Sequence, residues 1–217
     1  MATLFDELLK RAKAGETDAQ MAVAEAYFKG IGVLPSAIES LHWLEKAADK
    51  NKHASVQIVN MYMNGYGIPQ NKEKGFEIAE KYANKGNEIQ MFNLAGYYLN
   101  GVGTNANLDK AIECYEKAYE MGYLEAPYFL GYIYQTNQEV KDTEKMLKWY
   151  QTAADINDAR ACYNLAYIYY DGSVVVKDNK KALEYANKAL QYGLEQAKDL
   201  IELINSDNGY FGYSRIV

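Results

Sequence analysis

A short tyrosine–glycine motif recurs along this chain at a nearly constant interval. The sequence reads YFKGIG from Tyr27, YMNGYG from Tyr62 and YLNGVG from Tyr98. Tyr134 and Tyr169 continue the series, so that the five tyrosines are spaced by 35, 36, 36 and 35 residues. A period of this length is typical of proteins in which each repeat is a small helical unit that packs on its neighbours. The repeat therefore constrains the fold more than any other feature of the sequence.

The residues before each tyrosine predict an amphipathic helix. An aliphatic residue stands four positions upstream, a mostly small residue three upstream, and alanine eight upstream in four repeats of five. These offsets place the side chains along one stripe of a helix, with small residues where another helix must come close. The aliphatic positions, which we expect to be buried, are Val23, Ile58, Leu94, Leu130 and Leu165.

A second helix is predicted in each repeat, eight or nine residues after the tyrosine. A residue with a short polar side chain stands there, and such side chains accept a hydrogen bond from an unpaired amide of the first helical turn. An apolar stripe follows each of them. The unit is therefore helix, loop, capped helix and short turn. The five predicted N-cap residues are Ser36, Asn71, Asn107, Asp142 and Asp178.

The glycines of the motif could instead belong to a phosphate-binding dinucleotide loop. That loop follows a strand and carries a third glycine three residues after the second. Here a predicted helix precedes the motif, and the third position holds Pro35, Gln70 or Ala106. We therefore interpret the first glycine as the end of the helix, where positive φ is accepted without a Cβ clash. The second glycine lets the backbone fold back toward the next helix.

The combined pattern resembles a known family. Ala-x-x-x-Leu-Gly/Ala-x-x-Tyr-x-x-Gly-x-Gly followed by Lys-Ala-x-x-Trp/Tyr-Tyr-x-x-Ala-Ala looks like the Sel-one-like repeat (SLR), a relative of the tetratricopeptide repeat (TPR), over about residues 16–205. The resemblance implies an all-α fold, a right-handed α-α superhelix (solenoid) of five helix-hairpin repeats with capping helices at both ends. Repeat four departs from the pattern at Asn137 and Glu139, and repeat five at Val174, so those loops should differ in shape.

The same resemblance organises the chain as one SLR/TPR-like solenoid domain over 1–217. An N-terminal capping helix is expected at 3–15, five repeats at 16–193, a C-terminal capping helix at 194–205 and a tail at 206–217. The aromatic tail residues should pack on the last helices or in a groove of this or a neighbouring molecule, because they are too apolar for a fully solvated end; they are Tyr210, Phe211 and Tyr213.

Composition and reactive residues argue against several classes of function. The balance of 23 basic and 29 acidic residues disfavours a nucleic-acid or membrane surface. The only two cysteines, Cys114 and Cys162, are far apart, which favours a reducing cytoplasm and inert packing thiols. His42 and His53 lack metal-ligand spacing and are expected at the surface. We predict no enzyme, no catalytic residue, no metal and no cofactor.

The resemblance places the first helix of each repeat on the concave face. Its non-core positions carry aromatic and amide side chains, which suit a binding surface. The basic residues of a carboxylate clamp are missing, since Met21, Ala22 and Glu25 hold the matching positions in repeat one. We expect Tyr128, Tyr132, Asn164 and Tyr167 to converge on one patch, although several tyrosines could simply pack between repeats. The full candidate set is Asn60, Phe92, Asn93, Tyr128, Tyr132, Tyr163, Asn164 and Tyr167.

These observations predict a non-enzymatic interaction scaffold that binds a peptide or protein segment in its concave groove. The resemblance implies a bacterial signalling adaptor, with two alternatives. One is an immunity protein that neutralises a secreted bacterial toxin, and the other is a hydrolase acting on small substrates of the cell-wall type. Self-association through exposed helices is a further alternative, and neither a nucleic acid nor a membrane is expected as a partner.

Overall fold

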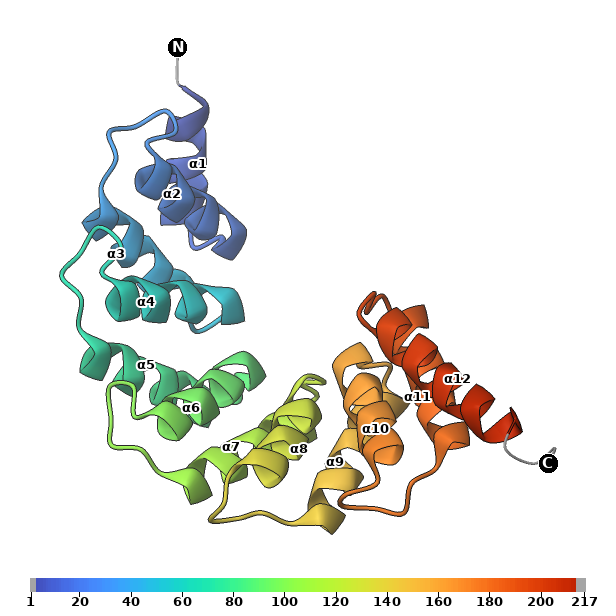
Figure 1. The fold of residues 1–217 in the computed structure, drawn as a ribbon. Helices are drawn as coiled ribbons and strands as arrows, with labels where there is room; N and C mark the ends of the chain where they lie inside the picture. Colours follow the sequence, from blue (N-terminus) through green and yellow to red (C-terminus); the bar gives the residue numbers. More distant parts are fainter. Residues whose placement is uncertain (1–2, 214–217) are drawn as a thin grey trace. The chain divides into compact units, whose positions relative to one another are not determined.

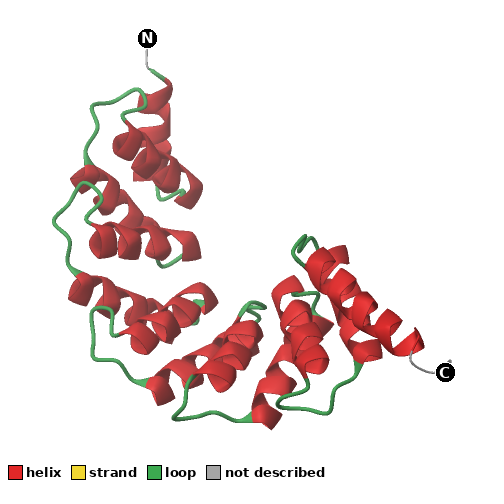
Figure 2. Cartoon of the chain, viewed as in Figure 1, coloured by secondary structure: helices red, strands yellow, loops and turns green. Residues whose placement is uncertain are grey.

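The computed structural model describes residues 3–213, with side chains described as far as Asp207. Within this range the chain forms twelve α-helices joined by loops and turns, without a strand (Figures 1 and 2). The predicted all-helical repeat fold is confirmed. The aromatic tail is predicted to pack on the last helices or in a groove. Its side chains lie outside the described ones, so this stays a prediction; they are Tyr210, Phe211 and Tyr213.

The chain divides into two compact units, Met1–Tyr123 and Leu124–Val217. In the first unit, each helix packs against the next one along the chain, and α4 also contacts α6. A leading helix precedes three hairpins there. These helices are α1 (Leu4–Lys13), α2 (Thr17–Lys29), α3 (Ala37–Ala47), α4 (Lys52–Asn64), α5 (Lys72–Asn84), α6 (Glu88–Asn100) and α7 (Leu108–Glu120). The prediction of one domain over 1–217 stays a prediction.

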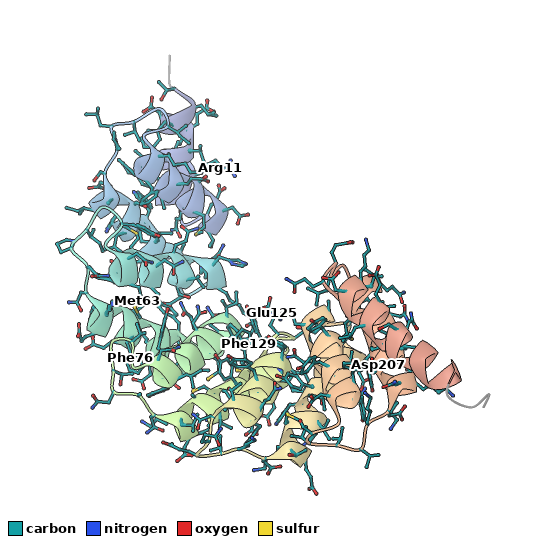
Figure 3. The ribbon with its side chains drawn as sticks, in the orientation of Figure 1. Arg11, Met63, Phe76, Glu125, Phe129 and Asp207 are labelled. Carbon is teal, nitrogen blue, oxygen red and sulfur yellow. The ribbon has the colours of Figure 1, made fainter. Side chains whose placement is uncertain are left out.

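The second unit holds two hairpins and a final helix, again with each helix against the next. The helix after the last hairpin continues to Tyr213 rather than ending at 205. Figure 3 shows Asp207 on this helix, where its Oδ2 accepts a 2.8 Å hydrogen bond from the Tyr170 hydroxyl. The five helices are α8 (Ala126–Thr136), α9 (Thr143–Asp155), α10 (Ala159–Asp171), α11 (Asn179–Gln191) and α12 (Ala197–Tyr213).

The core follows the predicted stripe. All five aliphatic residues four positions before the repeated tyrosines are buried, as are the small residues that follow them. One of these small positions is Gly131, where an added Cβ would lie 2.6 Å from the ring of Tyr150. Glycine is therefore needed where this fully buried tyrosine packs directly on the backbone of α8.

The repeated tyrosine and the N-cap residue are joined through the main chain. All five predicted N-cap side chains accept a hydrogen bond from the backbone N–H three residues later, which confirms the caps. The N–H of each cap residue donates in turn to the carbonyl of its repeat's tyrosine, over 2.8 to 3.2 Å. In the last three repeats, a lysine ammonium lies 5.0 or 5.1 Å from the tyrosine ring centre; the lysines are Lys110, Lys145 and Lys181. The tyrosine therefore fixes where the second helix begins.

The two glycines of the motif have different tasks. Each first glycine ends its helix in the left-handed conformation, as predicted. The second glycine makes a contact that sequence reasoning missed: a Cβ on Gly103 would lie 2.2 Å from the carbonyl oxygen of Lys72, in the preceding hairpin. The loop that holds Gly103 thus contacts the start of α5, the second helix of the preceding repeat. In repeat four, Asn137 is extended instead, which confirms a different loop.

Candidate functional site

The second unit carries an aromatic stack at the surface of α8. Tyr128 and Tyr132 lie one turn apart, and their rings stack with centroids 6.5 Å apart and an interplanar angle of 22°. The ring of Tyr150, from α9, lies 6.1 Å from that of Tyr128. Tyr150 is fully buried whereas Tyr132 is 48% exposed. The buried ring of Tyr150 therefore packs against Tyr128, whose ring in turn stacks with the exposed ring of Tyr132.

The hydroxyl of Tyr150 connects this stack to α10. It donates a 2.6 Å hydrogen bond to Oε1 of Gln135. Burial raises the pKa of Tyr150 well above its ordinary value, and a hydrogen bond from the Asn164 side chain acts in the opposite direction. The hydroxyl therefore stays protonated at neutral pH. Asn164 of α10 thus lies beside the Tyr150 hydroxyl, and its amide has donor and acceptor capacity for further bonds.

Arg160 covers one face of Tyr128. Its guanidinium carbon lies 4.1 Å from the centre of the Tyr128 ring and 5.7 Å from that of Phe129. Asp158 holds the guanidinium through two hydrogen bonds, of 3.2 and 2.6 Å, and the bond raises the pKa of Arg160. Asp158 also caps α10. Figure 3 shows Phe129 on α8, together with Glu125, just before the helix. Asp158, at the start of α10, thus fixes the cation that lies over the Tyr128 ring of α8.

The other two candidate tyrosines of this unit have different surroundings. Tyr163 packs against a buried cluster that includes Ala166 and Leu200, so it contributes to the contact of α10 with the end of the chain. Tyr167 is 51% exposed and lines a cavity of about 220 Å³ together with Gln135 and Val174. The structure therefore gathers Tyr128, Tyr132 and Asn164 around Tyr150 and leaves Tyr163 outside this group.

Two candidates of the first unit, Phe92 and Asn93, lie beside an internal network. The Phe92 ring packs 5.3 Å from Tyr115 and 4.5 Å from Tyr123, measured between ring centres. The side chain of Asn93 donates to Gln90 over 3.5 Å. Gln90 is fully buried and donates to Ser55 of α4. Phe92 therefore packs α6 against α7 and the turn that follows it, whereas Asn93 belongs to the network that joins α6 to α4.

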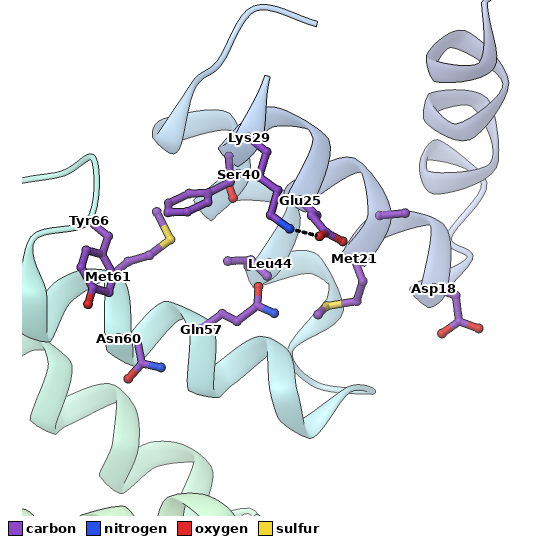
Figure 4. Close-up of a pocket in the computed structure, with 12 residues that line it drawn as sticks. Asp18, Met21, Glu25, Lys29, Ser40, Leu44, Gln57, Asn60, Met61 and Tyr66 are labelled. Carbon is purple, nitrogen blue, oxygen red and sulfur yellow. Dashed lines mark hydrogen bonds and ion pairs between the residues drawn. The ribbon is translucent and has the colours of Figure 1, made fainter. Parts of the chain in front are cut away.

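The remaining candidate, Asn60, lines a groove of about 550 Å³ on the first unit (Figure 4). Side chains of α2 form one wall and side chains of α4 the other, with Ser40 and Leu44 of α3 as the buried floor. The lining residues are Asp18, Met21, Ala22, Glu25, Phe28, Lys29, Ser40, Leu44, Gln57, Asn60, Met61 and Tyr66. Met21, Ala22 and Glu25 among them hold the positions that match the basic residues of a carboxylate clamp.

Sequence reasoning missed Gln135, Tyr150 and Arg160. Tyr150 belongs to a second helix, whose residues were interpreted as packing alone. A usable signal was Gly131, because glycine in a helix interior costs about 1 kcal/mol relative to alanine and marks a close neighbour. For Arg160, the signal was an isolated positive charge on a helix otherwise rich in tyrosine.

The two cysteines behave as packing groups, and the two histidines lie at the surface. Cys114 and Cys162 are both buried, and burial raises the pKa of each thiol to about 11, so neither is a thiolate at neutral pH. His42 and His53 are exposed, as predicted. Within the described residues, no three metal-ligating side chains come together. No helix in that range combines the length and apolar character needed to cross a bilayer.

Comparisons with known proteins give a consistent result. The Sel1 repeat family matches residues 17–52, 60–87, 91–123, 124–158 and 159–193. One similar structure is that of c5321, a protective antigen of uropathogenic Escherichia coli with an SLR fold. Its sequence is 27% identical, and the two structures match with a TM-score of 0.75 over 92% of this chain and 44% of that one. This chain therefore spans less than half of c5321.

Two further structures are similar. A Sel1 repeat protein from Oxalobacter formigenes is 25% identical, with a TM-score of 0.70 over 86% of this chain and 75% of that one. Immunity protein Pa5087 from Pseudomonas aeruginosa is 19% identical, with a TM-score of 0.53 over 88% and 74%, a similarity of fold alone. Among curated proteins, none matches significantly.

Proposed function

Because the chain belongs to the Sel1 repeat family, whose members in general bind protein partners, we propose that it is a non-enzymatic scaffold. In this proposal, the second unit binds an extended protein segment on the surface formed by Tyr128, Tyr132, Asn164 and Tyr167. We call these four residues the aromatic surface. A cytoplasmic location and a signalling role are part of the same proposal.

The observation that carries the proposal is that exposed tyrosine rings lie on neighbouring side chains that are held by internal contacts. Tyr132 and Tyr167 are both about half exposed, at 48% and 51%. Rigid aromatic side chains offer a large contact area at a small entropic cost and are enriched among the residues that dominate binding energy. Tyr128, with which Tyr132 stacks, contacts both the buried ring of Tyr150 and the guanidinium of Arg160. These contacts fix its position. The Asn164 amide could bond the backbone of the bound segment.

The test uses Tyr132→Ala and Asn164→Ala, with Tyr132→Phe as the conservative variant. A partner captured from native lysate by the wild-type protein is identified and then titrated against each variant. We expect Tyr132→Ala to weaken binding by about thirtyfold, which corresponds to about 2 kcal/mol for a central aromatic anchor. Tyr132→Phe should retain most of the affinity. Helical circular dichroism should be unchanged in all three.

A matched control lies on α11, the second helix of the last repeat, where Glu184 is exposed and paired with Lys188 at 2.9 Å. Glu184→Lys should leave binding unchanged. If instead Glu184→Lys abolishes binding while Tyr132→Ala and Asn164→Ala bind as wild type, the partner uses the second helices and the proposal is wrong.

Two other functions stay as alternatives. The similarity to Pa5087 supports an immunity role only at the level of the fold, and capture of a toxin in the same experiment would favour it. A hydrolase would need a reactive group. The two buried thiols are poor nucleophiles at neutral pH, since their pKa values lie near 11.

A further inference from the structure

The groove between α2 and α4 differs from the matching contact one repeat later. Between α4 and α6, the buried Gln90 and Asn87 both donate to Ser55 and so connect the two helices. In the repeat before, the position of Gln90 is held by Ala54, which has no amide to donate. The position of Ser55 is held by Gln20, whose side chain donates instead to the Ala12 carbonyl of α1. Among the described residues, Asn51 holds the position of Asn87, but no side-chain hydrogen bond joins α2 to α4 as Ser55 joins α4 to α6.

The interior of the groove is apolar. Leu44 of α3 is 1% exposed and Met61 of α4 is 3% exposed, and Met21 lies across from them on α2 (Figure 4). Unbranched methionine side chains adapt to ligands of different shape. At one end of the groove stand Phe28 and Tyr66, which are both about half exposed. A large apolar side chain would lose its contact with water on entering.

The polar rim carries more negative than positive charge. Glu25 forms an exposed ion pair with Lys29 at 2.6 Å, the dashed line in Figure 4. Such pairs between residues four apart on a helix contribute only a few tenths of a kcal/mol, so their partners exchange readily. Asp18 forms no ion pair with any described residue. The lining thus holds two carboxylates and one ammonium group, and Arg11, which lies near Asp18, is already bonded to Glu16 at 2.7 Å.

We propose that this groove is a second binding site, which takes a basic peptide segment with an apolar anchor. A leucine-sized or larger side chain enters between Met21 and Met61, and a lysine or arginine on each side of it meets Asp18 or Glu25. The amides of Gln57 and Asn60, on the opposite wall, bond the peptide backbone. The site lies in the first unit, so it does not depend on the aromatic surface and can hold or fail separately.

Methionine methyl groups provide a direct measurement. The full protein, with its methionine methyls labelled with ¹³C, is titrated with a synthetic octapeptide of glycine and serine that places one leucine between two lysines. We expect the Met21 and Met61 signals to shift, and Met146, which lines the cavity of the second unit, to stay in place. A peptide with glutamates in place of the lysines should bind at least about tenfold more weakly, and added salt should reduce that difference.

Variants separate charge from fold. Asp18→Asn combined with Glu25→Gln should weaken binding of the lysine peptide by about tenfold. The matched control is Glu113→Gln, because Glu113 forms the same four-residue ion pair with Lys117, at 2.7 Å, on α7. It should bind as wild type. Ala22→Trp should fill the groove and abolish binding, with an unchanged signal of the buried Met91 in α6 showing that the first unit stays folded.

Several results would overturn the proposal. Equal affinity for the lysine and glutamate peptides would remove the charge argument, and so would an equal loss in Glu113→Gln. Shifts at Met146 without shifts at Met21 and Met61 would place the binding elsewhere. A lack of any shift at several millimolar lysine peptide would show that the groove does not bind such a segment.

Discussion

The first unit and the second unit are built from the same hairpin but present different side chains at matching positions. Two residues before the repeated tyrosine stand Glu25, Asn60 and Gly96 in the first unit, and Tyr132 and Tyr167 in the second. In the first unit Glu25 and Asn60 line a groove, whereas Tyr132 and Tyr167 expose their rings in the second. The residues that form the repeat and the residues that form its surface therefore vary independently.

The loops differ in the same way. In the first unit, Gly103 lets its loop touch the preceding hairpin, whereas Val174 holds the matching position in the second. Val174 is 42% exposed and lines the cavity beside Tyr167. Because a branched side chain cannot approach a backbone as closely as glycine, the loss of one glycine accompanies an opening in the surface.

The largest expected effect tests whether the two cores are equivalent. Leu94 in the first unit and Leu130 in the second are both buried, at 4% and 0% exposure. Leu94→Ala and Leu130→Ala should each lower the free energy of unfolding by about 2–5 kcal/mol, because each leaves a cavity. Urea denaturation measures the loss, and hydrogen exchange shows which unit opens. An unchanged midpoint for either variant would show that its repeat is packed differently.

The next effect tests the loop difference. Gly103→Ala should lower the free energy of unfolding by about 2–3 kcal/mol, because it adds a close contact with Lys72 to the strain of a positive φ. Gly122→Ala is the matched control, since Gly122 also has a positive φ but nothing lies within 4 Å of an added Cβ. Val174→Gly should change stability by less than about 1 kcal/mol. Equal losses for the two alanine variants would contradict the role given to the Gly103 contact.

The last effect appears only at high pH and concerns the one thiol in each unit. Burial raises the pKa of Cys114 and of Cys162 from 9.0 to about 11. Below pH 9 the folded and unfolded chains both keep these protons. Between pH 9 and 11 the unfolded chain loses them first, so stability should fall as pH rises, by up to about 2–3 kcal/mol for each thiol.

Denaturation between pH 8 and 11 measures this slope. Cys114→Ala and Cys162→Ala should each make it shallower, whatever their stability at pH 8, because tyrosine ionisation is common to all variants. An equal slope in wild type and both variants would mean that the thiols are not protected from ionisation by burial.

Much of the fold could be predicted because it depends on short-range rules. The spacing of Leu94, Leu130 and their counterparts along a helix determines which face is apolar, whatever lies opposite. The cap residues act on amides three positions away, and the first glycines act on their own φ angles. Each of these interactions is complete within one hairpin.

The candidate site depends on contacts between hairpins, and there the sequence alone was less informative. It identified Tyr132 and Tyr167 as surface aromatics, but it could not show that Asn164 lies beside the Tyr150 hydroxyl or that Tyr163 packs toward α12. It also overlooked the second glycine's contact with the preceding hairpin. The period and the caps determine that hairpins form and stack. Which side chains are then used up in packing depends on distances between helices of different repeats, and only the tertiary structure determines these.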